Sequence, residues 1–198
     1  MLNDPHDLTF GPDGRLHVAD KFASSISVLD PETMDIVDVI GEGQLFGIRY
    51  ISFGTKARAA VAATGLGVVV VFEDLTIENP QLSFVLQVPG TEGTLIYSNG
   101  NMYTMAGDVG SIIAYSPGGD LIGEAGNHVG AHDIAEDPEG NIWVADNFNR
   151  RLVKYSPDLK QLQSLDDAKY GFIGPRYVDF DRFGRIAVAD QGLKALKN

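Results

Sequence analysis

The sequence predicts an all-β chain folded as a β-propeller, and three observations carry this prediction. The tripeptide Val-Ala-Asp occurs at residues 18–20, 144–146 and 188–190, with degenerate copies at 61–63 and 104–106. The turns that precede these copies are spaced by 43, 43, 40 and 44 residues and lie at Gly14, Ala57, Gly100, Gly140 and Gly184. Each unit also contains four short strand-like segments. A period of about 40–45 residues with this content is typical of four-stranded propeller blades.

The first unit shows the expected elements in order. A short alternating strand at 6–10 leads into Gly11-Pro12-Asp13-Gly14, which is a strong turn signal. Three further strands are expected at 15–20, 25–30 and 35–40, and the fourth unit repeats the pattern at 132–136, 141–146, 151–155 and 160–165. The second strands are apolar on both faces, which indicates burial between neighbouring blades. The fourth strands are mixed, as expected at an outer rim, and only 166–170 is compatible with a helical turn.

The units form a higher-order repeat of three blades. Residues 6–31 match 132–157 at nine of 26 positions, and 49–65 match 176–192 at eight of 17. We therefore expect a single domain with four and a half to five blades, derived from a six-bladed parent fold. The expected blades lie near 5–43, 46–90, 91–128, 131–168 and 175–198, and the last is incomplete because it lacks its outer strand.

An incomplete ring leaves apolar blade faces and a strand edge uncovered. Three explanations are open: a chain cut from a longer protein, self-association that covers the open faces, or a compact five-blade closure. The expectation for partners is therefore self-association or a missing segment that completes the ring, together with a small molecule or a protein as ligand.

Composition narrows the classes of partner and compartment. The chain has 198 residues, 15 Lys plus Arg against 27 Asp plus Glu, and a net charge of −12. This balance argues against nucleic-acid binding and against an anionic membrane surface, because both depend on a basic face. The chain has no cysteine and no N-terminal apolar segment. We expect a cytoplasmic protein by default, and a targeting segment outside this chain would make it extracytoplasmic.

The candidate site consists of the first residue of each inner strand, because inner strands line the central channel of a propeller. All five residues at this position are ionisable: His6, Arg49, Glu92, His132 and Arg176. Two guanidinium groups can hold a carboxylate or phosphate. The imidazoles can bind a divalent metal or transfer protons, and Glu92 can act as a base or a third ligand. The alternative is that these side chains are merely solvated and that His6 and Asp7 form a local hydrogen-bonded pair.

The motifs Pro5-His6-Asp7-Leu8, Gly11–Asp20 and Asp146–Pro157 resemble the NHL-repeat family. The resemblance covers most of the chain, is strongest in the first and fourth units, and implies a six-bladed propeller. The family includes interaction and RNA-binding scaffolds as well as peptidyl-hydroxyglycine α-amidating lyases, while gluconolactonase-type enzymes are more distant relatives. In the amidating lyases the His of Pro-His-x-Leu is a zinc ligand, which the resemblance carries to His6 and, less closely, to His132.

Those lyases take three histidines from different blades, and this chain supplies two at the channel, on opposite sides by the block symmetry. The cofactor therefore stays unknown, with a divalent metal, zinc or calcium, as the candidate. Recurring Asp20, Asp146 and Asp190 are expected to cap turns through backbone N–H groups.

Two hypotheses follow. The first is an NHL-type module that binds a small anionic ligand or a protein partner at the channel mouth. The alternative is a metal-dependent lyase or hydrolase of the amidating-lyase or lactonase type. Whether the chain is an enzyme stays open, and no catalytic residue is assigned.

Overall fold

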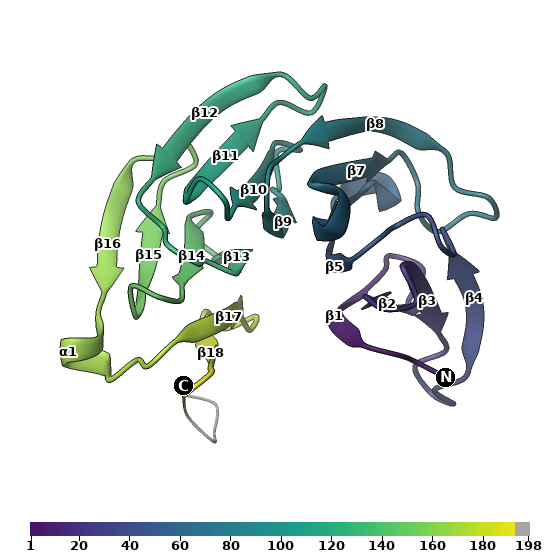
Figure 1. Cartoon of the computed structure of the whole chain (residues 1–198), viewed down its shortest axis with the longest axis horizontal. Coiled ribbons are helices and arrows are strands. Elements are labelled where there is room, and N and C mark those ends of the chain that lie inside the picture. Colours follow the sequence, from purple (N-terminus) through teal and green to yellow (C-terminus); the bar gives the residue numbers. More distant parts are fainter. Residues whose placement is uncertain (193–198) are drawn as a thin grey trace.

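The computed structural model describes residues 1–192 and is almost entirely β-structure (Figure 1). It contains four sheets of four antiparallel strands and one sheet of two strands. The sheets follow one another in chain order around an arc, with the innermost strand of each sheet toward the centre (Figure 1). The predicted propeller-type, all-β fold class is therefore confirmed. The part of the fifth predicted blade at 193–198 lies outside the described residues.

Within each sheet the strands run in chain order from the centre outward. The first sheet contains β1 (Pro5–Phe10), β2 (Leu16–Asp20), β3 (Ser25–Leu29) and β4 (Ile36–Ile40). The second contains β5 (Ile48–Phe53), β6 (Ala59–Ala63), β7 (Val68–Phe72) and β8 (Leu82–Gln87). The third contains β9 (Thr91–Ile96), β10 (Met102–Ala106), β11 (Ser111–Tyr115) and β12 (Leu121–Gly126).

The fourth sheet contains β13 (Asp133–Glu136), β14 (Ile142–Asp146), β15 (Arg151–Tyr155) and β16 (Gln161–Leu165), and the fifth contains β17 (Pro175–Phe180) and β18 (Ile186–Asp190). Short helical turns are η1 (Thr55–Ala57), η2 (Thr64–Leu66) and α1 (Asp167–Tyr170). Among the described residues, no helix is long and apolar enough to cross a membrane.

Burial explains the composition of the strands. Every residue of β2, β6, β10 and β14 is buried. The strands β6, β10 and β14 lie between two neighbouring sheets, whereas Leu16 and Val18 of β2 pack against Leu2. In β4 and β16 nearly all residues are exposed or half-buried, as expected for the outer rim. The β18 strand differs from the other second strands: Ala187 is exposed, and only Val188 and Asp190 are buried.

The last residues of the inner strands β5 and β17 point toward the preceding sheet. The ring of Phe53 on β5 lies 4.9 Å from that of His17 on β2, and Phe180 on β17 lies 5.8 Å from Trp143 on β14. In β1 the corresponding residue, Phe10, is 62% exposed, as is Leu8. Within the described part of the chain, the leading face of the first sheet is therefore uncovered at its inner strand, β1.

Candidate functional site

The inner strands enclose a central cavity of about 620 Å³, which we call the channel. Residues of β1, β5, β9, β13, β17 and β18 line it. A second recess of about 580 Å³ opens beside Glu92 and His132 among the loops that lead into the inner strands. We call this end of the channel the mouth.

The structure joins three of the five predicted mouth residues directly, and His6 lies near enough to Arg49, Glu92 and Arg176 to be affected by their charges. A guanidinium nitrogen of Arg49 on β5, Nη1, lies 2.6 Å from Oε1 of Glu92 on β9. The other carboxylate oxygen of Glu92 lies 3.7 Å from Nδ1 of His132, which immediately precedes β13. Glu92 therefore connects the second blade to the fourth. The ligand-binding role of the five residues stays a prediction.

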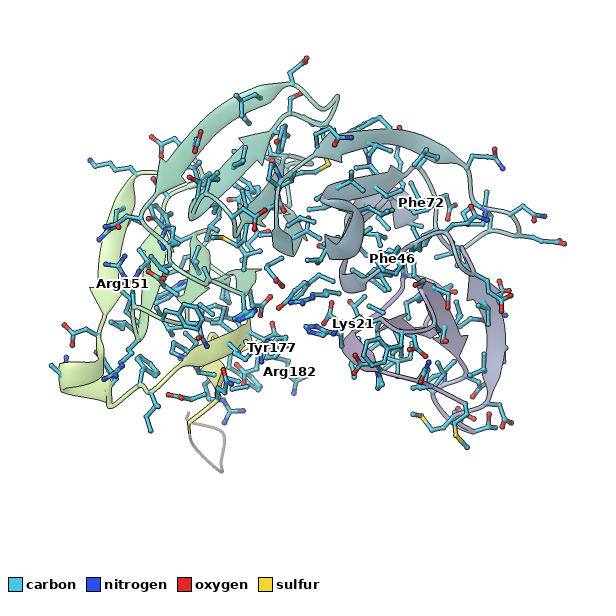
Figure 2. All side chains as sticks on the ribbon, in the orientation of Figure 1. Lys21, Phe46, Phe72, Arg151, Tyr177 and Arg182 are labelled. Carbon is cyan, nitrogen blue, oxygen red and sulfur yellow. The ribbon has the colours of Figure 1, made fainter. Side chains whose placement is uncertain are left out.

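His6 lies in a locally positive environment. Its pKa is lowered to about 4, first by burial and then by the charge of Arg49, with further contributions from Arg176 and Lys21 and an opposing one from Glu92. A neutral imidazole at pH 7 adds no positive charge to this cluster. In Figure 2 Tyr177 on β17 and Lys21 beside β1 both lie at the inner side of the arc. The mouth is thus cationic, although the whole chain is acidic.

Several polar atoms at the mouth are buried and have no hydrogen-bond partner among the described residues. They are Nε of Arg49, Nε of Arg176, Oε2 of Glu92 and Nδ1 of His132. Leaving such an atom unpaired costs roughly 1–3 kcal/mol, so buried polar groups almost always find a partner. A group of them at the edge of a recess is the arrangement expected of a site that is completed by water or by a ligand.

A second polar level lies directly below the mouth, and the sequence analysis did not identify it as part of the site. The residue after each mouth residue is Asp7, Tyr50, Gly93, Asp133 and Tyr177, in order. This order repeats after three blades, and that regularity was the available signal. The side chains of Asp7, Tyr50, Asp133 and Tyr177 all line the channel.

The carboxylates of Asp7 and Asp133 connect neighbouring blades. Oδ2 of Asp7 accepts a hydrogen bond from the backbone N–H of Ile51 (3.0 Å), and Oδ2 of Asp133 accepts one from Val178 (2.9 Å). The interpretation of His6 and Asp7 as a local pair is therefore wrong, because Asp7 bonds to the next blade. The donor to Asp7 is a backbone N–H of the neighbouring inner strand, and the spacing of the repeats does not show which residue of that strand lies beside Asp7.

Burial of the side chains at this second polar level shifts their pKa values. Burial raises the pKa of Asp7 to about 6 and that of Asp133 to about 8, and the charge of Asp179 contributes in both cases. The backbone hydrogen bonds of both carboxylates act in the opposite direction. Burial, with the nearby charge of Asp133, raises the pKa of Tyr50 as well.

Three aromatic rings form the wall between the two levels. The ring centroids of His6 and Tyr50 are 5.7 Å apart, those of His6 and Tyr177 are 6.3 Å apart, and those of the two tyrosines are 6.1 Å apart. The hydroxyl of Tyr177 lies 3.3 Å from Nδ1 of His6 and donates to its carbonyl oxygen at 3.4 Å. His6 is therefore held by the first and last inner strands together.

The mouth histidines do not fit a three-ligand zinc site. Nδ1 of His6 is directed at Tyr177, whereas Nδ1 of His132 faces Glu92, so the two imidazoles belong to different contacts. Within residues 1–192, no group of three or more His, Asp or Glu side chains is placed to hold a metal ion. The zinc role that the resemblance implies for His6 and His132 therefore has no third ligand in the described part of the chain.

His128, which the sequence patterns did not indicate, belongs to a buried hydrogen-bond network in the fourth blade. His128 is fully buried, with Nδ1 3.0 Å from Oδ2 of Asp146 and Nε2 2.7 Å from the hydroxyl of Tyr155. Asp146 also accepts hydrogen bonds from the side chains of Asn149 and Arg151, which lies at the outer side of the arc (Figure 2). Asp146 was expected to cap a turn by accepting backbone N–H groups, and it accepts hydrogen bonds from side chains instead.

The other two recurring aspartates do bond to backbone N–H groups, most of them distant in sequence, and Asp190 also accepts the N–H of Gly192 two residues later at 3.1 Å, which is the local cap that was expected. Asp20 accepts from Asn3 and Asp4. Asp190 accepts from Ile173 and Gly174. In each case the carboxylate fixes the segment that enters the inner strand of its own blade.

Comparison with known proteins supports the fold. No family model and no curated protein sequence matches the chain. Among solved structures, virginiamycin B lyase from Staphylococcus aureus is similar with a TM-score of 0.78 and 10% identity, over 96% of this chain and 64% of that one. A streptogramin B lyase gives 0.79 and 14% over 94% and 62%, and the periplasmic gluconolactonase of Pseudomonas aeruginosa gives 0.69 and 16% over 82% and 54%.

The chain therefore spans less than two thirds of the length of these three structures. Identities of 10–16% establish a shared propeller-like architecture and nothing finer. The relationship to NHL repeats stays an interpretation of the sequence motifs.

Proposed function

We propose that the channel mouth binds the anionic group of a small molecule between Arg49 and Arg176, beside His6. The observation that carries this proposal is the pair of buried guanidinium Nε atoms without hydrogen-bond partners among the described residues. Arginine presents its N–H groups in a fixed fork that matches carboxylate and phosphate oxygens. The ion pair with Glu92 orients Arg49 and leaves its Nε available.

Size and charge support a small molecule rather than a protein surface. The recess beside Glu92, the partner of Arg49, and the channel lined by Tyr50 and Tyr177, which follow Arg49 and Arg176 in the chain, have volumes of about 580 and 620 Å³ and fall within the usual range for small-molecule sites. The lowered pKa of His6 reflects the positive field of Arg49, Arg176 and Lys21, after burial. Such a field in a protein of net charge −12 favours an anion at this place over the rest of the surface.

Calorimetric titration of the purified chain with phosphate, citrate and gluconate tests the proposal. We expect at least one anion to bind, and binding to weaken at least tenfold in Arg49→Gln and Arg176→Gln, because each removes a charged hydrogen-bond donor. Arg182→Gln is the matched control, since Arg182 is exposed and lies against Phe183, outside the residues that line the channel. Equal binding by the double variant and the parent chain would contradict the proposal.

The second candidate is a lyase or hydrolase, and the solved structures favour it because two lyases and a gluconolactonase share the fold. The carboxyl groups of Asp7 and Asp133 supply proton-transfer groups next to the mouth. Incubation with glucono-δ-lactone and with a streptogramin B peptide, with and without a chelator, tests it. Ring opening above the rate of the Asp133→Asn variant would support catalysis. Stoichiometric zinc in the purified protein would restore the metal-dependent alternative.

A further inference from the structure

Acidic groups line the channel below the mouth, in contrast to the arginines of the mouth itself. The described lining residues include four acidic side chains, at positions 7, 133, 136 and 179, and no Lys, Arg or His. Asp7 and Asp133 are equivalent residues of the first and fourth inner strands, because they pair with Ala19 and Ala145 of the two Val-Ala-Asp motifs. A carboxylate offers about four acceptor sites, and the backbone N–H groups of neighbouring blades occupy only part of this capacity.

A second observation, independent of these carboxylates, indicates a ligand at the same place. Tyr50 lines the channel and is only 2% exposed, and its buried hydroxyl lies close enough to that of Tyr177 to donate toward it. The hydroxyl of Tyr177 is directed in turn at the ring and carbonyl of His6. The hydroxyl oxygen of Tyr50 receives no hydrogen bond from the described residues, so this oxygen, which borders the cavity, is available to a donor on a bound molecule.

The carboxyl groups and tyrosines of this second polar level favour a cationic ligand. Burial, and for Asp133 also the charge of Asp7, disfavours the ionised form of these carboxyl groups, and a positive group between them favours it. The faces of Tyr50 and Tyr177 also attract an ammonium group through their ring electrons. A primary ammonium has three N–H donors and no acceptor, so it can bond to carboxylates and to a tyrosine hydroxyl oxygen together.

Taken with the cationic mouth, this arrangement defines a bipolar site. We propose that the channel binds a zwitterionic small molecule, with its anionic group at Arg49 and Arg176 and its ammonium group between Asp7 and Asp133 beside Tyr50. This inference rests on the proposed function and names the class of ligand. The two charge levels belong to consecutive residues of each inner strand, roughly 3.3 Å apart along it. Because consecutive side chains of a strand point in different directions, their charged ends lie further apart than these backbone positions, and a ligand with several methylene groups between its charges can span them.

Calorimetry with three probes of equal length tests the inference on the whole chain: 6-aminohexanoate, hexanoate and hexylamine. We expect 6-aminohexanoate to bind at least tenfold more tightly than either probe with one charge. Asp7→Asn combined with Asp133→Asn is expected to abolish this advantage while hexanoate binding is retained or strengthened, because the variant removes negative charge near the anion and keeps both arginines. Asp35→Asn is the control, because Asp35 is an exposed aspartate that lies outside the residues that line the channel.

Tyr50→Phe provides a second variant, since it removes only the hydroxyl, and it is expected to weaken 6-aminohexanoate several-fold without changing hexanoate. If hexanoate and 6-aminohexanoate bind equally and the aspartate variants change neither, the bipolar site is wrong and the anion site at the mouth stands. If hexylamine binds through the aspartates and a carboxylate adds nothing, the proposed anion site is wrong instead. Circular dichroism of each variant checks that the fold is retained.

Discussion

Asp7 and Asp133 lie 126 residues apart in the chain, and each accepts a hydrogen bond from the inner strand of the blade that follows its own. Ser52 makes a comparable contact, because its hydroxyl accepts the N–H of Ile96 in the next blade. These bonds cross from blade to blade at the wall of the channel. The side chains that give the channel its charge therefore also connect the blades, and ionisation in the channel affects the stability of the fold.

Asp133 is expected to make the protein less stable as the pH rises from 6.5 to 8. Its pKa is about 8 in the folded chain against an ordinary value of 3.8, so the folded state keeps a proton that the unfolded state has released. Stability then falls by up to about 1.4 kcal/mol per pH unit in this window, on the order of 2 kcal/mol in total, and less where water reaches the carboxylate. Urea unfolding at several pH values measures this slope.

The range from pH 6.5 to 8 is chosen because His6 and Asp7, whose pKa values are also shifted, change the stability mainly below pH 6.5. The pKa of His6 is lowered to about 4, so the folded state loses stability as the pH falls from 6.5 toward 4. The pKa of Asp7 is about 6, so most of its contribution is complete by pH 6.5. Asp133→Asn is expected to remove most of the slope above pH 6.5. The same slope in parent and variant would show that another group is responsible.

The repeat and the strand patterns were sufficient to predict the fold. Leu8 and Phe10 share one side of β1, and β2 is apolar on both sides. Such patterns reflect the place of a strand within a blade, so they can be recognised in the sequence. The turn at Ala57 was also placed correctly, although its φ of 60° lies where glycine is usual, because the spacing of the units located it.

The site was only partly predictable, because its contacts cross between blades. The spacing placed all five mouth residues at equivalent positions, yet it could not show that Glu92 pairs with Arg49 and faces His132. The spacing also could not distinguish a residue that lines the channel, such as Asp133, from any other polar residue of a strand. His128 was missed because it lies in a loop outside the repeating motif, and only the folded blade brings it to Asp146.

Phe53 and Phe10 occupy equivalent positions and provide a matched test of which blade faces are covered. Phe53→Ala is expected to lower the free energy of unfolding by about 2 kcal/mol, because its ring packs on His17 and on the core of the second blade. Phe10→Ala is expected to change it by less than about 0.5 kcal/mol, since the side chain is 62% exposed. Urea unfolding of both variants measures the difference.

An equal loss in the two variants would mean that the face of the first blade is covered in solution. Sedimentation across a range of concentrations would then identify self-association, which we propose as the way that a second copy covers Leu8 and Phe10. A mass equal to one chain at all concentrations would contradict that proposal.

The buried network around His128 is expected to be a major stabilising element of the fourth blade. His128→Ala leaves a cavity and removes one of the three side-chain partners of Asp146 and the ring nitrogen that contacts Tyr155, so we expect a loss of about 3 kcal/mol. Tyr155→Phe removes one hydroxyl and is expected to cost about 1 kcal/mol. A double-mutant cycle between the two positions should give a coupling above about 0.5 kcal/mol. Additive losses would indicate that the 2.7 Å contact contributes little.

Glu92 is expected to oppose anion binding at the mouth, although it orients Arg49. Its carboxylate occupies Nη1 of Arg49 at 2.6 Å and adds a negative charge beside the place where the anion would lie. Glu92→Gln keeps the shape and a hydrogen-bond acceptor while removing this charge. We therefore expect phosphate, citrate or gluconate to bind about three- to tenfold more tightly, with the gain decreasing at high salt. Weaker binding in Glu92→Gln at all salt concentrations would show instead that the ion pair is needed to position the guanidinium, and that Arg49 acts only when Glu92 holds it.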